Sequence, residues 1–201
     1  MKIGIISGSH RRAQSLKVAE YIQGQLTAEG VEAEVFSLAG NPLPLWDEGV
    51  WSGDEDWVER LTPWREALTA CDGFVVVSPE WHGQVPAGLK NFFLLFGRAE
   101  LGHKPALIVS VSAGDGGAYP VAELRMSSYK NSRLCYIPEH IIVRHVEQVL
   151  NAEAADNDVR ADDYYRRRID WALAILRQYA SALAAVRASG VIHSDDFRNG
   201  M

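Results

Sequence analysis

Gly73–Asn91, GFVVVSPEWHGQVPAGLKN, reads as a buried strand, a sharp loop and a helix in direct succession. Phe74–Val77 is a short β-branched and aromatic run, of the kind that a parallel sheet buries on both faces. Pro79 and Pro86 keep a helix from starting within the loop, and Gly83 allows a close backbone approach. A loop that directly follows a parallel strand lies at the edge where open α/β sheets bind ligands. The stretch therefore predicts a ligand-binding loop in an α/β fold.

The rest of the chain repeats this strand–helix pattern. Strands are expected at 2–7, 31–38, 73–78, 105–111 and within 135–143. Helices are expected from the end of loop 8–15 to residue 30, from the end of loop 41–56 to about residue 70, and over about 87–98, 121–130 and 162–187. Five strand–helix units predict a doubly wound parallel sheet with order 2-1-3-4-5, favoured over 3-2-1-4-5-6. We expect one domain over residues 1–188 and a mobile tail over 189–201.

Several segments depart from simple periodicity. Residues 41–56 carry two prolines, acids and two tryptophans, and a loop of this length is expected to be functional. Pro63 either begins a fresh helix after Thr62 or kinks the helix around it. Pro138 is expected to break or bend the last strand. The face of the last helix that is expected to point inward comprises Ile169, Ala172, Leu173, Leu176, Tyr179 and Leu183.

The composition excludes several classes of protein. The 201 residues carry a net charge of -6, which argues against nucleic acid as a partner. The N-terminus reads as a strand and not as a signal peptide, and the apolar run at 92–96 is too short to cross a membrane. Cys71 and Cys135 match no metal spacing and are expected to be free thiols in a reducing cytoplasm, so no metal site is assigned.

The first loop, Gly8–Ser15, has the composition of a phosphate site. Ser9, Gln14 and Ser15 offer hydroxyl and amide donors, and the loop adds Arg11 and Arg12 and the start of a helix. The loop matches neither GxGxxG nor GxxxxGK[ST], which disfavours a Rossmann turn or a P-loop. The structural alternative is a capped β–α turn with surface arginines.

The loops after the third and fourth strands suit a flat aromatic cofactor. Amides around Gly83 could serve the polar edge of a flavin ring and Trp81 could form its wall, although Trp81 could equally pack in the core or a lid. Ser112–Gly117 offers further amides. General acid–base work by His82 is disfavoured, because hydride transfer to a flavin needs no protein base, and no catalytic side chain is assigned.

Three motifs in order resemble the NADPH-dependent FMN reductase family, a flavodoxin-like group that includes quinone, azo-dye and chromate reductases. SPEWHGQVPAGLKN resembles the family's PEY-N-x-S-x-P-x-x-LKN segment, GSHRRAQS its GSxRxxS loop, and SAGDGGAYPVAELR its later glycine-rich loop. The match spans about residues 2–145. The resemblance implies a flavodoxin-like three-layer sandwich that binds FMN and takes NADPH or NADH as co-substrate.

The resemblance also implies where the cofactor lies. Ser9, Arg11 and Ser15 would bind the phosphate; the ring and the ribityl chain would lie along Pro79, Glu80, Trp81, His82 and Gly83; and the far side would be closed by Ser112, Gly114, Asp115, Gly116 and Gly117. The sequence departs from the family pattern at Gln14, Trp81, His82, Leu94 and Leu95.

The expected function is an FMN-dependent NAD(P)H oxidoreductase, with the chemistry at flavin N5. The electron acceptor would be small: a quinone, an azo compound, a metal oxyanion or free flavin. The alternatives are a flavodoxin-like electron carrier without an NAD(P)H site and a flavin-free interaction scaffold. The apolar run Phe92–Phe96 exceeds what one side of a sheet can bury, so it predicts an exposed patch and a homodimer or homotetramer through helix 87–98. The alternative is that loop 41–56 buries this helix completely.

Overall fold

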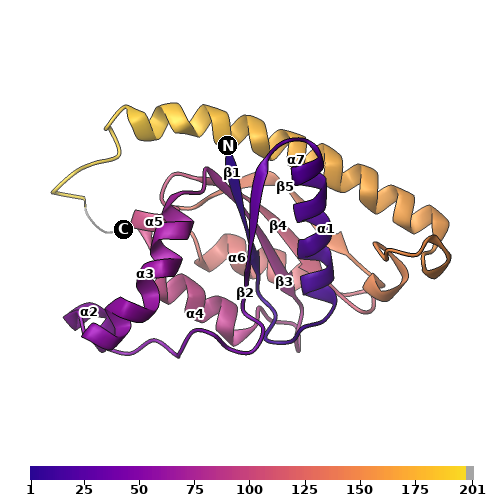
Figure 1. The fold of residues 1–201 in the computed structure, drawn as a ribbon, viewed down its shortest axis with the longest axis horizontal. Helices are drawn as coiled ribbons and strands as arrows, with labels where there is room; N and C mark the ends of the chain where they lie inside the picture. The colour runs from indigo at the N-terminus through magenta and orange to yellow at the C-terminus, as the bar shows by residue number, and fades with distance from the viewer. Residues whose placement is uncertain (198–201) are drawn as a thin grey trace.

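A five-stranded parallel sheet forms the centre of the computed structural model, which describes residues 1–197 (Figure 1). The strands are β1 (Lys2–Ser7), β2 (Glu32–Ser37), β3 (Gly73–Pro79), β4 (Pro105–Val111) and β5 (Cys135–Val143). Their order is β2-β1-β3-β4-β5 and every neighbouring pair is parallel, which confirms the predicted topology. All residues of the two strands β3 and β4 are buried, as expected of apolar strands that are covered on both faces.

The helices follow the predicted order but not all of the predicted bounds. They are α1 (Gln14–Ala28), α2 (Gly49–Ser52), α3 (Glu55–Thr69), α4 (Ala87–Leu95), α5 (Arg98–Leu101), α6 (Ala118–Ser127) and α7 (Val159–Ala188), with short 3-10 turns at Val146–Gln148 and Ala154–Asp156. The helix expected over 87–98 divides in two, because Phe96 has extended backbone and Gly97 begins α5. The helix expected to begin at residue 121 starts at Ala118.

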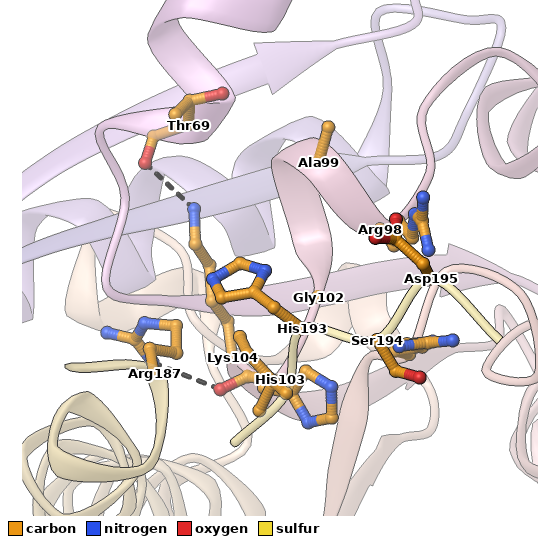
Figure 2. A pocket seen from close by; sticks show the side chains of 12 residues that line it. Thr69, Arg98, Ala99, Gly102, His103, Lys104, Arg187, His193, Ser194 and Asp195 are labelled. Carbon is orange, nitrogen blue, oxygen red and sulfur yellow. Dashed lines mark hydrogen bonds between the residues drawn. The ribbon is translucent and has the colours of Figure 1, made fainter. Parts of the chain in front are cut away.

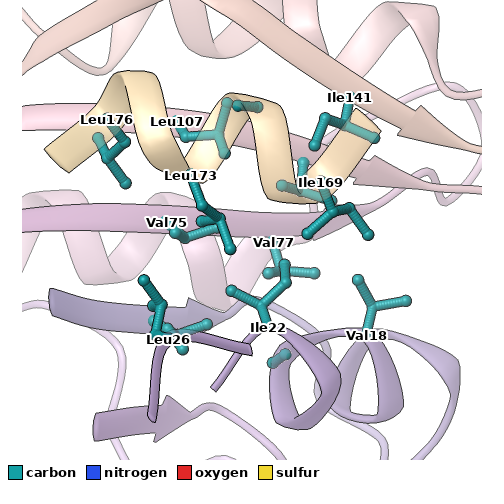
Figure 3. Close-up of a cluster of buried hydrophobic side chains, with 14 of the residues drawn as sticks. Val18, Ile22, Leu26, Val75, Val77, Leu107, Ile141, Ile169, Leu173 and Leu176 are labelled. Atoms are coloured by element: carbon teal, nitrogen blue, oxygen red, sulfur yellow. The ribbon is translucent and has the colours of Figure 1, made fainter. Parts of the chain in front are cut away.

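Helices cover both faces of the sheet, which confirms the three-layer architecture. Figure 3 shows α1 and α7 on the same face, where Val18 and Ile22 of α1 and Leu173 of α7 belong to one apolar cluster. The opposite face is covered by α3, α4 and α6, whose buried residues include Leu61, Leu89 and Leu124. The sheet therefore sits between two apolar cores, and only its strand ends are available to build a site.

The long loop 41–56 is more ordered than expected, since it contains α2 and the first two residues of α3. The side chain of Asn91 in α4 fixes this loop. Its Oδ1 accepts a hydrogen bond from the amide of Trp46 at 2.8 Å, and its Nδ2 donates to the carbonyl of Pro44 at 2.7 Å. The buried Asn91 thus attaches the loop to the helix that follows the second ligand-binding loop.

The apolar run 92–96 is mostly buried within the subunit, so the prediction of an exposed patch made by all five residues is wrong. Phe92, Leu95 and Phe96 are buried, Phe93 is half-buried, and only Leu94 is exposed, at 64%. The reason is a second helix: Trp64 of α3 stacks on Phe96 with ring centroids 5.9 Å apart. The alternative of complete burial is not met either, because Leu94 faces outward.

Three local predictions can be compared with the structure. Pro63 does not start a fresh helix, because α3 is continuous from residue 55 to residue 69 with Pro63 inside it, and the alternative of a kink there stays a prediction. At Pro138 the prediction is confirmed, since the β4–β5 register shifts between Ala106 and Ile108, which face Tyr136 and His140. In α7, Tyr179 is 39% exposed and Leu183 is only half-buried, while Ala180 is buried. The inward face of α7 therefore ends at Ala180 and does not include Tyr179 or Leu183.

The remaining predictions concern single features. Cys71 and Cys135 are free thiols beside β3 and β5. No helix within residues 1–197 is long and apolar enough to span a membrane. The mobility expected of residues 189–201 stays a prediction, and residues 198–201 lie outside the described part of the chain.

Candidate functional site

Three loops meet at the carboxyl edge of the sheet. The first loop, residues 8–13, follows β1; the second loop, residues 80–86, follows β3; and the third loop, residues 112–117, follows β4. Because β1, β3 and β4 are neighbours in the sheet, the topology alone brings these loops together. Every residue assigned to the cofactor lies in these loops, at the end of β3 (Pro79) or in the first turn of α1 (Ser15).

The first loop keeps the amino end of α1 free for a ligand. Ala13 is the N-cap residue of α1, and no side chain caps the helix there. Ser9 and Ser15 are buried, whereas Arg11 and Arg12 are exposed. The Ser9 Oγ accepts a hydrogen bond from the Arg11 amide at 3.1 Å, which fixes the loop. Unpaired helix amides, hydroxyls and guanidinium groups are the donors that a phosphate needs, so these residues fit the phosphate of FMN.

Gln14 is the first helical residue, and its Oε1 is buried without a hydrogen-bond partner among residues 1–197. A buried amide oxygen without a partner costs stability. Gln14 stands where the family pattern has serine, and its side chain lies beside the free helix amides. Its position therefore fits a ligand or water that donates a hydrogen bond at this point.

His10 links the first loop to the second, and the sequence prediction did not include it. Its Nε2 accepts a hydrogen bond from the Gly88 amide at 2.7 Å, in the first turn of α4. Its ring also packs edge-to-face against Trp81, with centroids 5.5 Å apart. Trp81 is half-buried, and its contact with His10 places it over the first loop. No local signal identifies His10, because position 10 is variable in the motif and the contact spans 78 residues.

The second loop turns tightly and presents backbone amides. Trp81 and Gln84 exchange hydrogen bonds of 3.1 and 3.0 Å, and the two residues between them, His82 and Gly83, have φ of 50° and 72°. Both values lie in the left-handed region that glycine tolerates best. The His82 side chain is exposed, and the amides of His82 and Gly83 have no acceptor within the described residues. These amides are available to the polar edge of a ring.

A salt bridge and a backbone hydrogen bond fix the far end of the second loop. Glu123 of α6 accepts a hydrogen bond from the Val85 amide at 2.8 Å and pairs with Lys90 at 2.6 Å. Burial by itself would raise the pKa of Glu123, but the bonds from Lys90 and Val85 outweigh it and lower the pKa. The carboxylate thus stays charged and attaches the loop to both α4 and α6.

Glu80 joins the second loop to the third. Its Oε2 accepts a hydrogen bond from the Gly117 amide at 2.6 Å, and its own amide donates to Val111 at 3.0 Å. Gly117 has φ of 104° and begins α6 without a side-chain cap. A Cβ at Gly116 would lie 2.8 Å from the Glu80 carboxylate, so the loop passes too close for a side chain there. Glu80 therefore orders the third loop.

Residues after β5 support the third loop from outside. Arg144 donates from Nε to the carbonyl of Gly116 at 2.9 Å, and His145 lies 2.9 Å from the Asp115 carboxylate. The Asp115 side chain is 93% exposed. Sequence reasoning missed Arg144 and His145, although their place directly after the strand next to β4 was a usable signal. Within the loop, the Ser112 Oγ accepts from the Gly114 amide at 3.2 Å.

The comparisons with known proteins agree with this geometry. The chain is 28% identical over 144 residues to an NADPH azoreductase of Bacillus sp. (strain OY1-2), which covers 71% of this chain and 76% of that one. It is 27% identical over 158 residues to a 2-hydroxy-1,4-benzoquinone reductase of Burkholderia sp., which covers 76% of this chain and 83% of that one.

Solved structures share the fold. The flavoenzyme NAD(P)H:(acceptor) oxidoreductase FerB of Paracoccus denitrificans superposes with a TM-score of 0.67 at 18% identity, over 92% of this chain and 97% of that one. An archaeal flavodoxin superposes with a TM-score of 0.51 at 14% identity, over 92% of this chain and 99% of that one. The family model described as NADPH-dependent FMN reductase matches residues 1–148, so the chain belongs to the NADPH-dependent FMN reductase family.

Proposed function

We propose that this chain is an FMN-dependent NAD(P)H oxidoreductase that reduces a small acceptor. Bound FMN would accept a hydride from a reduced nicotinamide and pass the electrons to that acceptor. The observation that carries the proposal is the free amino end of α1 beside the buried Ser9 and the exposed Arg11. It places phosphate donors at the carboxyl edge of the sheet, next to two further loops with free amides.

The proposed roles of the residues follow from their positions. Ser9, Arg11 and Ser15 bind the FMN phosphate, with the helix dipole of α1 adding to the attraction. The second loop, from Pro79 to Gly83, lies along the ring and the ribityl chain. Its rigid turn holds two amides at fixed positions, where they can bond the polar edge of the ring without reorganising.

The third loop closes the far side of the cofactor through five residues, which are Ser112, Gly114, Asp115, Gly116 and Gly117. Small side chains there leave the backbone accessible, and Glu80 keeps the loop in place through the Gly117 amide. No side chain of the site is assigned a proton transfer. The chain contributes binding and orientation, and the hydride chemistry belongs to the cofactor.

The proposed acceptor is a quinone or an azo compound, with metal oxyanions and free flavin as further members of the same class. The support is the chemistry named for the two relatives, an azoreductase and a benzoquinone reductase. Trp81 and His82 would border the acceptor, since Trp81 is half-buried over the first loop and His82 is exposed at the turn. A planar acceptor can stack against such a rim.

We further propose a homodimer or homotetramer that forms through α4. Leu94 is exposed on α4, and beside it lies a hollow of about 350 Å3 whose apolar wall includes Phe93 and Leu124 of α6. Exposed Met126 on α6 extends the same apolar area. An apolar surface next to a hollow favours self-association.

We also propose a cytoplasmic location, because both cysteines are free and reduced nicotinamide is a cytoplasmic reductant.

The decisive experiment is an absorbance spectrum of the purified protein with FMN, before and after anaerobic addition of NADPH and then NADH. Flavin bands that stay with the protein through gel filtration and bleach with either nucleotide are the expected result. A flavin that binds and is bleached by neither nucleotide would indicate an electron carrier. Protein that never retains FMN would contradict the proposal and leave only the fold in common with the family.

A further inference from the structure

A large cavity lies at the other end of the sheet, away from the three loops. Its volume is about 680 Å3, which is within the range of small-molecule sites. Figure 2 shows that its lining comes from the end of α3, the turn before β4 and the segment after α7. The flavin site uses none of these segments. The cavity therefore needs its own explanation.

The lining of the cavity is strongly cationic. It includes Arg98, Lys104, Arg133 and Arg187, together with the two histidines His103 and His193, and a single carboxylate, Asp195. The whole chain has only 20 lysines and arginines against 26 acids, so four cations around one acid is a marked reversal of the overall charge. Lys104 is buried and His103, Arg133 and Arg187 are half-buried, whereas Arg98 and His193 are exposed. Positive charge that is partly removed from water favours a bound anion.

Protein groups balance only part of this charge. Lys104 donates to the carbonyls of Leu68 and Thr69 at 3.0 and 2.8 Å, which satisfies the last turn of α3. Arg187 donates to the carbonyl of His103 at 3.0 Å and lies 3.7 Å from the carboxylate of Asp72. These are mostly bonds to neutral carbonyls, which orient the cations but do not neutralise them.

The side-chain nitrogens of Arg133 and His103, which line the cavity, can form further hydrogen bonds. The Arg133 guanidinium donates a hydrogen bond to the carbonyl of Phe197, again a neutral group. The Nε2 of His103 is buried and has no hydrogen-bond partner within residues 1–197. A ring nitrogen without a hydrogen-bond partner in the lining of a cationic cavity can form a hydrogen bond with an oxygen atom of a ligand.

The titration behaviour of these groups reports the same excess of positive charge. Burial lowers the pKa of His103, and the nearby charges of Arg133, Arg187 and His193 lower it further. Burial also lowers the pKa of Lys104 to about 8. Cys71 makes the largest opposing contribution, Arg187 adds a smaller lowering, and two carboxylates oppose it. An anion in the cavity would raise both pKa values.

We propose that this cavity binds the phosphate group of a small molecule, held by Arg133, Arg187 and His103. Phosphate is favoured because guanidinium groups bond its oxygens in pairs, and because a dianion offsets more of the local charge than a single carboxylate. The volume leaves room for an organic part beyond the phosphate. The ligand is thus inorganic phosphate or a phosphate monoester, and it binds independently of the flavin.

Histidine NMR tests the proposal directly, because the chain has six histidines and two of them line the cavity. Protein labelled with 15N-histidine is titrated with inorganic phosphate and, in a second arm, with glycerol 3-phosphate. The His103→Gln variant assigns the His103 signal. The expected result is a saturable shift of the His103 and His193 signals, while chloride at equal ionic strength causes none. The His10 signal reports separately on phosphate at the first loop.

Arg133→Gln should weaken the binding by about tenfold, because it removes one charge-assisted pair of bonds. Its one described side-chain bond is to Phe197, so the fold should be retained, and FMN absorbance with far-UV circular dichroism checks this. Arg60→Gln, on the exposed side of α3, is the matched control and should leave binding unchanged. Arg187→Gln is the second variant and should weaken binding by a similar factor.

The two arms distinguish the sources of the phosphate. Tighter binding of the ester assigns the site to a phosphorylated metabolite, and equal binding assigns it to free phosphate. The absence of a saturable His103 shift in both arms would overturn the proposal. So would a shift that survives unchanged in both arginine variants.

Discussion

The Nε2 atom of His10 lies 2.7 Å from the backbone nitrogen of Gly88, so a side chain of the first loop caps the helix that follows the second loop. A ring nitrogen that accepts a hydrogen bond from an amide carries no hydrogen itself, so in this contact the ring hydrogen lies on Nδ1. Pro86, the N-cap residue of α4, has no side-chain donor or acceptor of its own. One contact therefore fixes the start of α4 and the position of the first loop together.

Replacing His10 by alanine should lower the free energy of unfolding by about 1 kcal/mol, because it leaves the Gly88 amide without its acceptor. His10→Asn retains a side-chain oxygen and should lose less. Urea denaturation of the three proteins without added ligand measures the difference. An alanine variant as stable as the wild type would show that the hydrogen bond contributes nothing to the fold.

The partner substitution Gly88→Ala should destabilise the protein through the same contact. A Cβ at residue 88 would lie 2.1 Å from the His10 Nε2, so the imidazole would have to leave. In the His10→Ala background this clash is absent, and the cost of Gly88→Ala should fall by about 1 kcal/mol or more. Additive costs in the double-mutant cycle would contradict the contact.

Arg11 and Arg12 form a matched pair for testing the phosphate site. Both are exposed, but the family motif assigns the phosphate to Arg11 alone. Arg11→Gln should raise the dissociation constant for FMN about tenfold and reduce its salt dependence, because one charge-assisted bond to the phosphate is lost. Arg12→Gln should change the constant less than about threefold. Fluorescence quenching of FMN measures both, and equal effects would refute the assignment.

The sheet could be predicted closely because its strands carry their own signal. Residues 2–7 and 105–111 are apolar runs next to Gly- or Pro-containing turns, and both strands have the predicted bounds. The three loops could also be placed, since the order of parallel strands determines which strand ends are neighbours. Local sequence and one topological rule suffice for these features.

Contacts between distant segments could not be predicted in the same way. The burial of Phe96 depends on Trp64, and the order of the third loop depends on Glu80. Helix periodicity likewise overestimates the inward face of α7, because Tyr179 is 39% exposed while its neighbour Ala180 is buried. Each of these outcomes is determined by tertiary geometry and not by the neighbouring residues.

The bond from Glu80 to Gly117 allows a test of loop order. Glu80→Ala frees the Gly117 amide and should lower the free energy of unfolding by about 1–2 kcal/mol. Glu80→Gln keeps an oxygen acceptor and should lose no more than about half of that. Chemical denaturation with and without FMN gives both values. If the glutamine variant lost as much free energy of unfolding as the alanine variant, the negative charge of Glu80 and not its hydrogen bond would stabilise the loop.

The stability of the protein should depend on pH through Lys104. Its pKa is about 8 in the folded state, mainly because of burial, against 10.5 for the free side chain. Between these values the unfolded chain binds the proton that the folded chain lacks, so the free energy of unfolding rises with pH from about 8 to 10.5. Below pH 8 Lys104 is charged in both states, so the full cost of burying its charge lowers the free energy of unfolding.

Cys71 acts in the opposite direction. Burial raises the pKa of its thiol from 9.0 to about 11, so its contribution to stability falls with pH across that range. The difference between the wild type and Lys104→Met isolates the lysine. That difference should change in favour of the wild type by up to about 3 kcal/mol between pH 7 and pH 10. A difference that is constant with pH would show that Lys104 titrates normally.

Leu94 provides the test of self-association. It is the exposed member of an otherwise mostly buried apolar run, and the apolar hollow between α4 and α6 lies beside it. Leu94→Arg places a charge on that surface and should convert the proposed oligomer to a monomer at micromolar concentration, measured by light scattering after gel filtration. Val159→Arg, at the exposed start of α7, is the matched control and should leave the mass unchanged.

Because both positions are exposed, neither substitution should alter the fold, so a change of mass reports on the interface itself. A wild-type protein that is already monomeric, or a Leu94→Arg variant with an unchanged mass, would exclude α4 as the interface.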